Sequence, residues 1–283
     1  MLLRILFSAV LAHAAEPVRL ENAVSLRADY GASDYHQIDF RGKFRLDDAF
    51  DGAFGVLHER ELHTGSAGAL RAQLGFRPAS VLHARAAFLY QMEPNAINGF
   101  GFDGGLDWTA NPRDENEHET ILSLDYATTT FRQKGVPSDP AVLLAQRFLR
   151  RQWVFRWAQE VSESFSTLLF AEIDSYASAQ GNLVNTATDF HRRPLADGNG
   201  MTAGFQHWSA GLALRFQLTD DWRLGIDGAR AEIYNVATLA DTFAADLSYQ
   251  IDNDWWLGGH AGTSRQDQRN TIAFGGLSLR YEF

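Results

Sequence analysis

Apolar and polar side chains alternate with a period of two residues over most of this chain. The clearest example is residues 207–216, whose apolar row is Trp208, Ala210, Leu212, Leu214 and Phe216. The opposite row is His207, Ser209, Gly211, Ala213 and Arg215. Similar alternation runs over residues 37–46, 82–91, 100–108 and 152–157. Successive side chains of a β-strand point to opposite faces of the sheet, so the pattern predicts many strands with one apolar face each.

The composition limits which kind of β-protein this is. After the N-terminus no apolar stretch approaches the ~18 residues of a membrane-spanning helix, and the mean hydropathy is -0.24. Yet 20 Phe, 8 Tyr and 7 Trp are a heavy aromatic load for a soluble chain. A membrane barrel has an apolar lipid-facing side and a polar lumen, which reconciles these facts. We therefore predict an all-β fold, an antiparallel up-and-down transmembrane β-barrel. A soluble β-sandwich is the alternative, although it rarely sets charges so regularly opposite long apolar rows.

Net charge and cysteine content narrow the partners. The net charge of -10 argues against nucleic acid, because phosphate binding needs clustered Lys and Arg. The chain has no cysteine, so in an exported protein sheet closure rather than disulfides must supply stability. No Cys or His cluster has zinc spacing, and the sequence predicts neither a metal nor a cofactor.

The first residues have the pattern of a secretion signal. A positive start ending at Arg4 precedes an apolar run from Ile5 to Leu11, and Ala12-His13-Ala14 follows as a cleavage site. We expect residues 1–14 to be a signal peptide and residues 15–283 to form one barrel. A buried N-terminal helix or strand is the alternative.

Turns of two lengths predict the barrel's orientation. Short polar turns followed by an apolar residue occur at 46–50, 77–81, 161–165, 218–222 and 251–255. Short turns and interfacial Trp are typical of the periplasmic rim, so the longer segments 133–146 and 178–202 should lie outside the cell.

Counting strands between these turns gives about fourteen, with twelve or sixteen as the alternatives if one hairpin is misjudged. The weakest segment is 52–61, where neither face is clearly apolar. A barrel of this size should have a narrow lumen.

The C-terminal strand carries a resemblance to a known class. Leu277, Leu279, Tyr281 and Phe283 alternate with polar residues, and Phe283 is the last residue. This resembles the closing strand of Gram-negative outer-membrane β-barrel proteins, in which such a row is the C-terminal assembly signal. The resemblance implies an outer-membrane location. It implies contact with outer-membrane lipids and lipopolysaccharide, and with the barrel-assembly machinery and periplasmic chaperones. The oligomeric state stays open.

Three shorter motifs are similar to those of the YaiO-type barrel family. They are Tyr30-Gly31, His58-Glu59-Arg60 and residues 101–106. That family is linked to exopolysaccharide exporters, so the similarity implies a role in polysaccharide passage.

The pair His207 and Ser209 raises an enzymatic alternative. Outer-membrane phospholipases and lipid A deacylases carry a His-x-Ser pair, whose spacing puts base and nucleophile on one strand face. Here Trp208 and Leu212 are expected on the lipid-facing side, so His207 and Ser209 should face the lumen. We expect them to be polar lumen groups rather than a catalytic pair. His83 and His260 should also point inward, and no catalytic residue is predicted.

The inward charges are the strongest functional clue. The predicted basic wall of the lumen is Arg41, Lys43, Arg45, Arg71 and Arg85. The predicted acidic wall is Asp103, Asp107, Asp125 and Glu172. Such charges either pair into a ladder that fills the barrel or create a field across a pore that attracts anions.

The sequence therefore predicts a passive outer-membrane channel, or a barrel that assists the passage of small solutes or polysaccharide. The alternatives are an outer-membrane lipid-modifying enzyme and a non-conducting structural or adhesive barrel.

Overall fold

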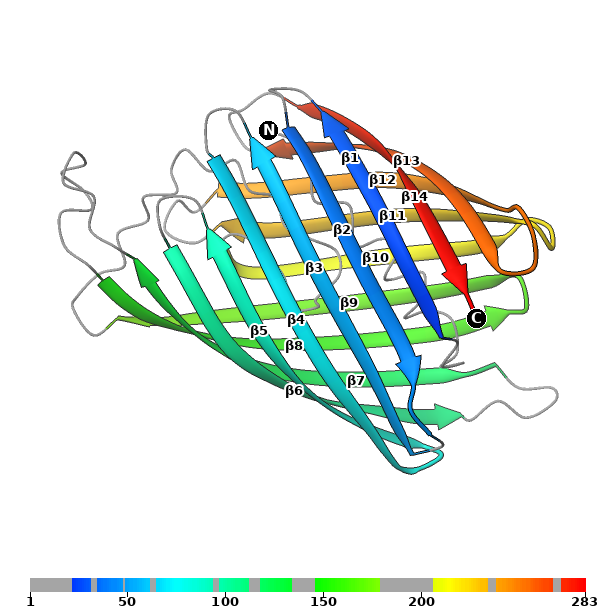
Figure 1. Ribbon diagram of the computed structural model, residues 1–283, viewed down its shortest axis with the longest axis horizontal. Coiled ribbons are helices and arrows are strands. Elements are labelled where there is room, and N and C mark those ends of the chain that lie inside the picture. The colour runs from blue at the N-terminus through cyan, green and yellow to red at the C-terminus, as the bar shows by residue number, and fades with distance from the viewer. Residues whose placement is uncertain are drawn as a thin grey trace.

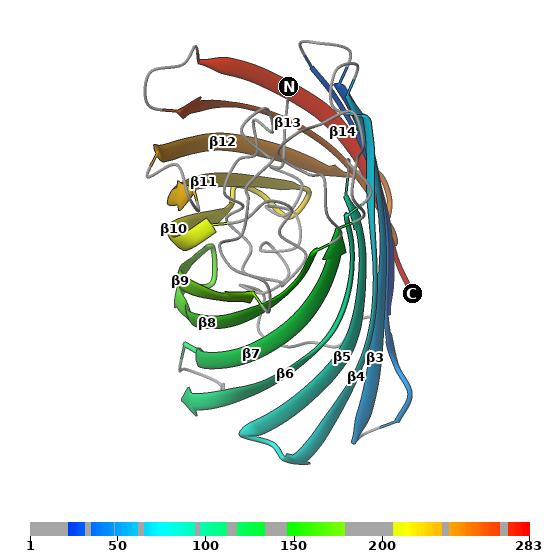
Figure 2. The ribbon, with the colours of Figure 1, turned by 90° about the vertical axis from the view of Figure 1, so that its left-hand side faces the viewer.

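The computed structural model describes residues 22–31, 35–47, 49–61, 65–93, 97–111, 118–133, 146–178, 206–233, 238–266 and 271–283. In these residues the chain forms fourteen strands in one closed, antiparallel barrel, as predicted (Figures 1 and 2). The strands are β1 (Ala23–Gly31), β2 (Tyr35–Arg45), β3 (Phe50–Glu61), β4 (Gly65–Ala79), β5 (Leu82–Glu93), β6 (Ile97–Asn111), β7 (Thr120–Gln133), β8 (Gln146–Ser162), β9 (Phe165–Ser178), β10 (Gln206–Gln217), β11 (Trp222–Ile233), β12 (Thr238–Gln250), β13 (Trp255–Gln266) and β14 (Ile272–Glu282).

No helix in the described part of the chain is long and apolar enough to cross a membrane. The predicted signal peptide, residues 1–14, and most of the two long segments lie outside the described residues.

The barrel closes by pairing its first and last strands. Leu26 of β1 lies opposite Leu279 of β14, and the register continues along both strands. Beyond the paired strands, the Phe283 amide donates a hydrogen bond to the Asn22 carbonyl at 2.8 Å. Closure leaves no sheet edge with unpaired backbone groups, which is what a strand-built membrane protein requires.

The short turns all lie at one end of the barrel, on the right in Figure 1, which we call the turn end. In two of these turns an aspartate fixes the shape, because a short acidic side chain can accept hydrogen bonds from the backbone just beyond it. Asp47 accepts from the amides of Ala49 and Phe50 at 2.8 and 2.7 Å. Asp252 does the same for Asp254 and Trp255 at 3.0 and 2.9 Å. The opposite end, to which residues 134–145 and 179–205 connect, is the loop end.

The outer face is apolar and exposed, as a lipid-facing surface must be. Leu74, Ile173 and Leu277 are 63%, 64% and 64% exposed, each on an outward position of its strand. Near the turn end, outward aromatic rings pair across strands, with ring centroids 4.7 to 4.8 Å apart: Phe165–Phe216, Trp222–Tyr249 and Trp255–Tyr281. Rings at this depth form the aromatic girdle of a membrane barrel.

The inner face combines polar and apolar positions. One inward row across β7 to β10 is wholly apolar, made of Ile121, Ala158, Leu168 and Ala213. Ala213 is only 1% exposed, so the inner wall is packed at this position. Period-two patterning separates the two faces without requiring every inward position to be polar.

Candidate functional site

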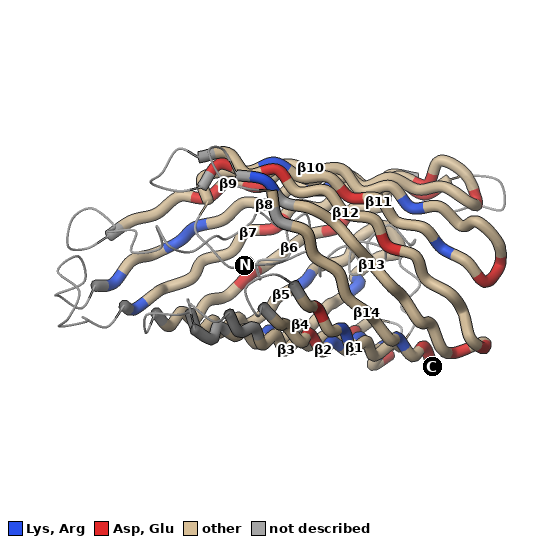
Figure 3. Tube along the Cα trace, turned by 90° about the horizontal axis from the view of Figure 1, so that it is seen from above, with Lys and Arg blue, Asp and Glu red and all other residues tan. Residues whose placement is uncertain are grey.

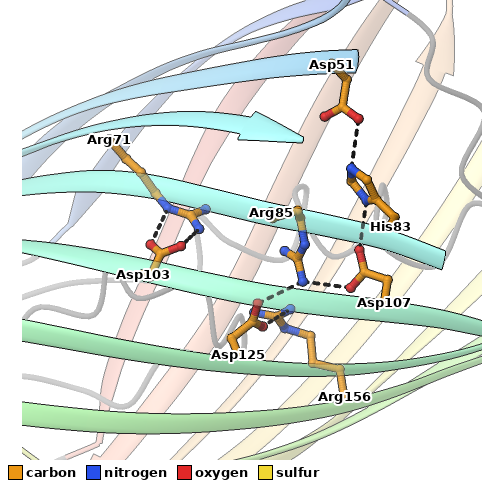
Figure 4. A network of polar contacts seen from close by, with 8 residues as sticks. All are labelled: Asp51, Arg71, His83, Arg85, Asp103, Asp107, Asp125 and Arg156. Atoms are coloured by element: carbon orange, nitrogen blue, oxygen red, sulfur yellow. Dashed lines mark hydrogen bonds and ion pairs between the residues drawn. The ribbon is translucent and has the colours of Figure 1, made fainter. Parts of the chain in front are cut away.

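Inward charges from six neighbouring strands meet on one part of the inner wall (Figure 4). His83 of β5 lies directly opposite Asp107 of β6, and its Nδ1 lies 3.0 Å from that carboxylate. Its Nε2 lies 2.8 Å from Asp51 of β3. The imidazole therefore bridges two carboxylates that stand on strands three apart in the sheet.

Arg85 extends the chain of contacts in the other direction. Its guanidinium donates to Asp107 at 2.7 Å and to Asp125 of β7 at 2.8 Å. Arg156 of β8 reaches the second oxygen of Asp125 at 2.6 Å. All these side chains are mostly buried, with Arg85 11% exposed. The charges of a buried ion pair attract each other strongly. Removing one partner destabilises the fold, because the other charge stays buried without compensation.

A second pair lies beside this network, one step toward the loop end. Arg71 of β4 donates two hydrogen bonds to Asp103 of β6, at 3.1 and 2.9 Å. The geometry is the two-pronged arrangement that a guanidinium makes with a carboxylate. With this pair, Arg71 and Arg85 of the predicted basic wall contact Asp103, Asp107 and Asp125 of the predicted acidic wall. On this side the charges form a ladder of neutralising pairs.

Glycines make room for contacts that skip a strand. Gly105 stands on β6 between Arg85 and Asp125, and a Cβ at this position would lie 1.8 Å from the Asp125 carboxylate. Gly276 of β14 stands in the same way between Asp29 and His260, which hydrogen bond across it. Inward glycines flanked by opposite charges are the signal that sequence reasoning missed.

The three cations of β2 differ from those of the ladder. Arg41 pairs along its own strand with Asp39, at 2.9 Å from Nε. Lys43 and Arg45 continue the same face toward the turn end, and both are exposed. Arg45 Nε donates to the Asp47 carbonyl at 3.1 Å. The structure thus places two solvent-accessible cations at the turn-end mouth.

Glu172, the fourth predicted acidic residue, belongs to a separate cluster on β8 to β10. Arg150 contacts Glu172 at 3.0 Å and Asp174 at 2.6 Å. The Tyr176 hydroxyl donates to Asp174 at 3.2 Å. Gln152 and Gln206 both donate to Glu172. The predicted acidic wall is therefore two groups, of which only the first contacts the predicted basic wall.

Comparison with known proteins identifies the architecture. No protein-family model matches the chain, and no curated protein does. The CymD monoaromatic hydrocarbon channel superposes with a TM-score of 0.60 at 9% identity, over 98% of this chain and 91% of that one. OprB of Pseudomonas putida gives 0.53 at 7% identity, over 93% of each chain. OccAB1 of Acinetobacter baumannii gives 0.53 at 10% identity, over 93% of this chain and 74% of that one. This is the fold of Gram-negative outer-membrane β-barrels. At these identities, the likeness of this barrel to each of the three proteins is one of fold.

His207 and Ser209 do not lie on one face of β10. A register irregularity between Gln206 and Trp208 turns His207 outward, where it is exposed. Ser209 points inward, is 1% exposed, and its hydroxyl lies 3.3 Å from Gln206 Nε2. The prediction that both residues face the lumen was wrong for His207, because a bulge breaks the period of two that the prediction assumed. Base and nucleophile are thus held on opposite sides of the wall.

His83 and His260 both face inward, each against a carboxylate. Within the described residues, no three His, Cys, Asp or Glu side chains are grouped so that they could hold a metal ion.

Proposed function

We propose that this outer-membrane barrel is a passive channel for small solutes. The observation that carries the proposal is the contrast between its two faces: a closed wall with exposed apolar side chains outside and ion-paired charges inside. A wall of this kind separates a polar passage from lipid. We place the loop end outside the cell, since longer connections belong on that side of such barrels.

The charge at the turn-end mouth should influence which solutes enter. The charges of the ladder on β3 to β8 are paired with one another, so its long-range field is weak. Lys43 and Arg45 are exposed on the inner face of β2, with the neutralised Arg41 behind them. Exposed cations at a mouth raise the local concentration of anions. We infer a preference for small anionic solutes.

A second candidate is a channel for solutes with an apolar part. The apolar row from Ile121 to Ala213 supports it, because it makes part of the inner wall apolar, next to the charged pair of β7 and β8. CymD is named as a channel for monoaromatic hydrocarbons, and these are apolar solutes.

Liposome swelling tests the proposed channel directly. Purified folded protein in liposomes should admit a pentose and small organic anions at rates that fall with solute size. Protein-free liposomes should admit neither. If protein-containing liposomes stay closed to every solute, the barrel is filled and the proposal fails.

The same assay separates the two solute classes. At pH 8, benzoate and a sugar acid of similar size carry the same charge but differ in apolar surface. If the apolar row assists passage, benzoate should enter faster, and Leu168→Thr should reduce that advantage. Equal rates in wild type would leave only the anion channel.

A further inference from the structure

Three arginines lie together on the outer face near the loop end. Arg132 of β7 stands directly opposite Arg147 of β8, and Arg151 follows four residues along β8. All three occupy outward positions and are exposed. We call Arg132, Arg147 and Arg151 the arginine patch; Figure 3 shows the barrel with its Lys and Arg positions in blue. Like charges directly opposite one another on a sheet are destabilising, so such a patch needs a counter-charge.

The described residues do not provide that counter-charge. No Asp or Glu occupies an outward position of β6, β7, β8 or β9 in the described part of these strands. None of the three arginines has an ion pair or hydrogen bond with a described residue. Within the described part of these strands the patch therefore has no balancing acid, and a bound anion would supply one.

Elsewhere at the loop end, outward charged side chains have partners on the neighbouring strand. Arg230 of β11 donates two hydrogen bonds to Asp241 of β12, at 2.6 and 2.9 Å. Beside them, Trp208 donates to Glu232 at 2.7 Å. The arginine patch is thus a local departure, and Arg230 is a matched control for it.

Aromatic residues fix the depth of the patch in a bilayer. Tyr126 and Trp153 lie opposite each other on β7 and β8, with ring centroids 4.6 Å apart. Trp153 follows Arg151 directly in the outward row of β8, and Phe155 comes next. Tyr and Trp settle at the headgroup level of a membrane, so the guanidinium groups beyond them lie among the headgroups.

The neighbours of Arg151 are short and carry hydroxyl groups. Thr128 of β7 stands opposite it on one side and Ser175 of β9 on the other. Short neighbours leave the guanidinium open to a ligand, and their hydroxyls can donate to phosphate or sugar oxygens.

We propose that the arginine patch binds the phosphate groups of a phosphorylated glycolipid, the lipid A part of lipopolysaccharide, in the outer leaflet. Guanidinium groups suit this ligand, because they bind phosphate oxygens with two parallel hydrogen bonds. The inference rests on the proposed placement of the loop end outside the cell.

Native mass spectrometry of the folded protein with bisphosphorylated lipid A tests the proposal. The variant Arg132→Gln/Arg147→Gln/Arg151→Gln should bind lipid A at least about tenfold more weakly, since each charge-assisted hydrogen bond contributes about a factor of ten or more. Arg230→Gln, whose partner is Asp241, should bind as wild type does. Lipid A stripped of its phosphates should bind wild type as weakly as lipid A binds the triple variant.

Three results would overturn the proposal: undiminished binding by the triple variant, equal binding of the dephosphorylated lipid, or complete displacement of lipid A by millimolar inorganic phosphate. Removing mutual repulsion should not impair folding, and if the triple variant fails to fold, Arg147→Gln alone gives the same comparison.

Conductance distinguishes this inference from the proposed function. The triple variant should conduct as wild type does, because the patch lies outside the lumen. Patch-dependent lipid A binding by a barrel that does not conduct would support the glycolipid site and refute the channel. Conductance with patch-independent binding would do the reverse.

Discussion

At the scale of single residues, the stability of the inner wall depends on ion pairs in which each charge compensates its partner. Arg71 and Asp103 are 15% and 6% exposed, so neither can exchange its partner for bulk water easily. Burying two ions is costly, and the pair offsets that cost only while both are present. The outer pair of Arg230 and Asp241, 57% and 50% exposed, is a different case because water and salt screen it.

We therefore predict that Arg71→Met lowers the free energy of unfolding by about 3–5 kcal/mol, because Asp103 is left buried without its partner. Arg71→Met/Asp103→Leu should recover most of this loss. Arg230→Met should cost no more than about 1 kcal/mol. Guanidinium unfolding followed by tryptophan fluorescence measures all three. A double variant as unstable as Arg71→Met would show that the loss comes from packing and not from charge.

At the scale of strands, β6 shows how two adjacent glycines can have different roles. Gly104 faces outward. A Cβ added there would have the Arg85 carbonyl oxygen as its nearest neighbour, at 3.7 Å. Gly105 faces inward, where the Cβ would displace Asp125 from its contact with Arg85. Gly104 therefore leaves open space on the lipid-facing side, whereas Gly105 leaves the room that the Arg85–Asp125 ion pair needs on the inner side.

Gly105→Ala should destabilise the barrel by about 1–3 kcal/mol, the usual cost of overpacking. Gly104→Ala should be neutral or slightly stabilising, because it restricts the unfolded chain without a clash. Equilibrium unfolding of the two variants under the same conditions makes the comparison. Equal effects would mean that the ladder tolerates a methyl group between its partners.

The strands were predictable from the sequence because sheet pairing needs only a period of two and turns to interrupt it. Even segment 52–61, the weakest, belongs to β3. The site was less predictable, since period two says which face a residue is on but not what it contacts there. His207 is an exception even to the assignment of faces, because the bulge in β10 interrupts the alternation at this residue. The division of the acidic residues into two groups depends on cross-strand register, which Glu172 alone does not reveal.

At the scale of the whole molecule, the outer face decides whether the barrel belongs in a membrane. Leu212 is 40% exposed and faces outward from the middle of β10. Leu212→Arg should cost about 2–4 kcal/mol in lipid bilayers, the penalty for a cation at the bilayer midplane. Leu212→Phe should cost little. Refolding both variants into vesicles and measuring unfolding tests this, and a tolerated arginine would mean that this row does not face acyl chains.

Single-channel recording in a planar bilayer tests the central claim, an open passage with a basic mouth. Wild type should show steady conductance steps and, in a salt gradient, a reversal potential that indicates anion preference. Lys43→Gln/Arg45→Gln should shift the reversal potential toward cations, and the shift should shrink at 1 M salt, where the screening length is about 3 Å. Arg230→Gln, on the outer face, should leave the reversal potential unchanged. A correctly folded barrel that shows no steady conductance would contradict the account.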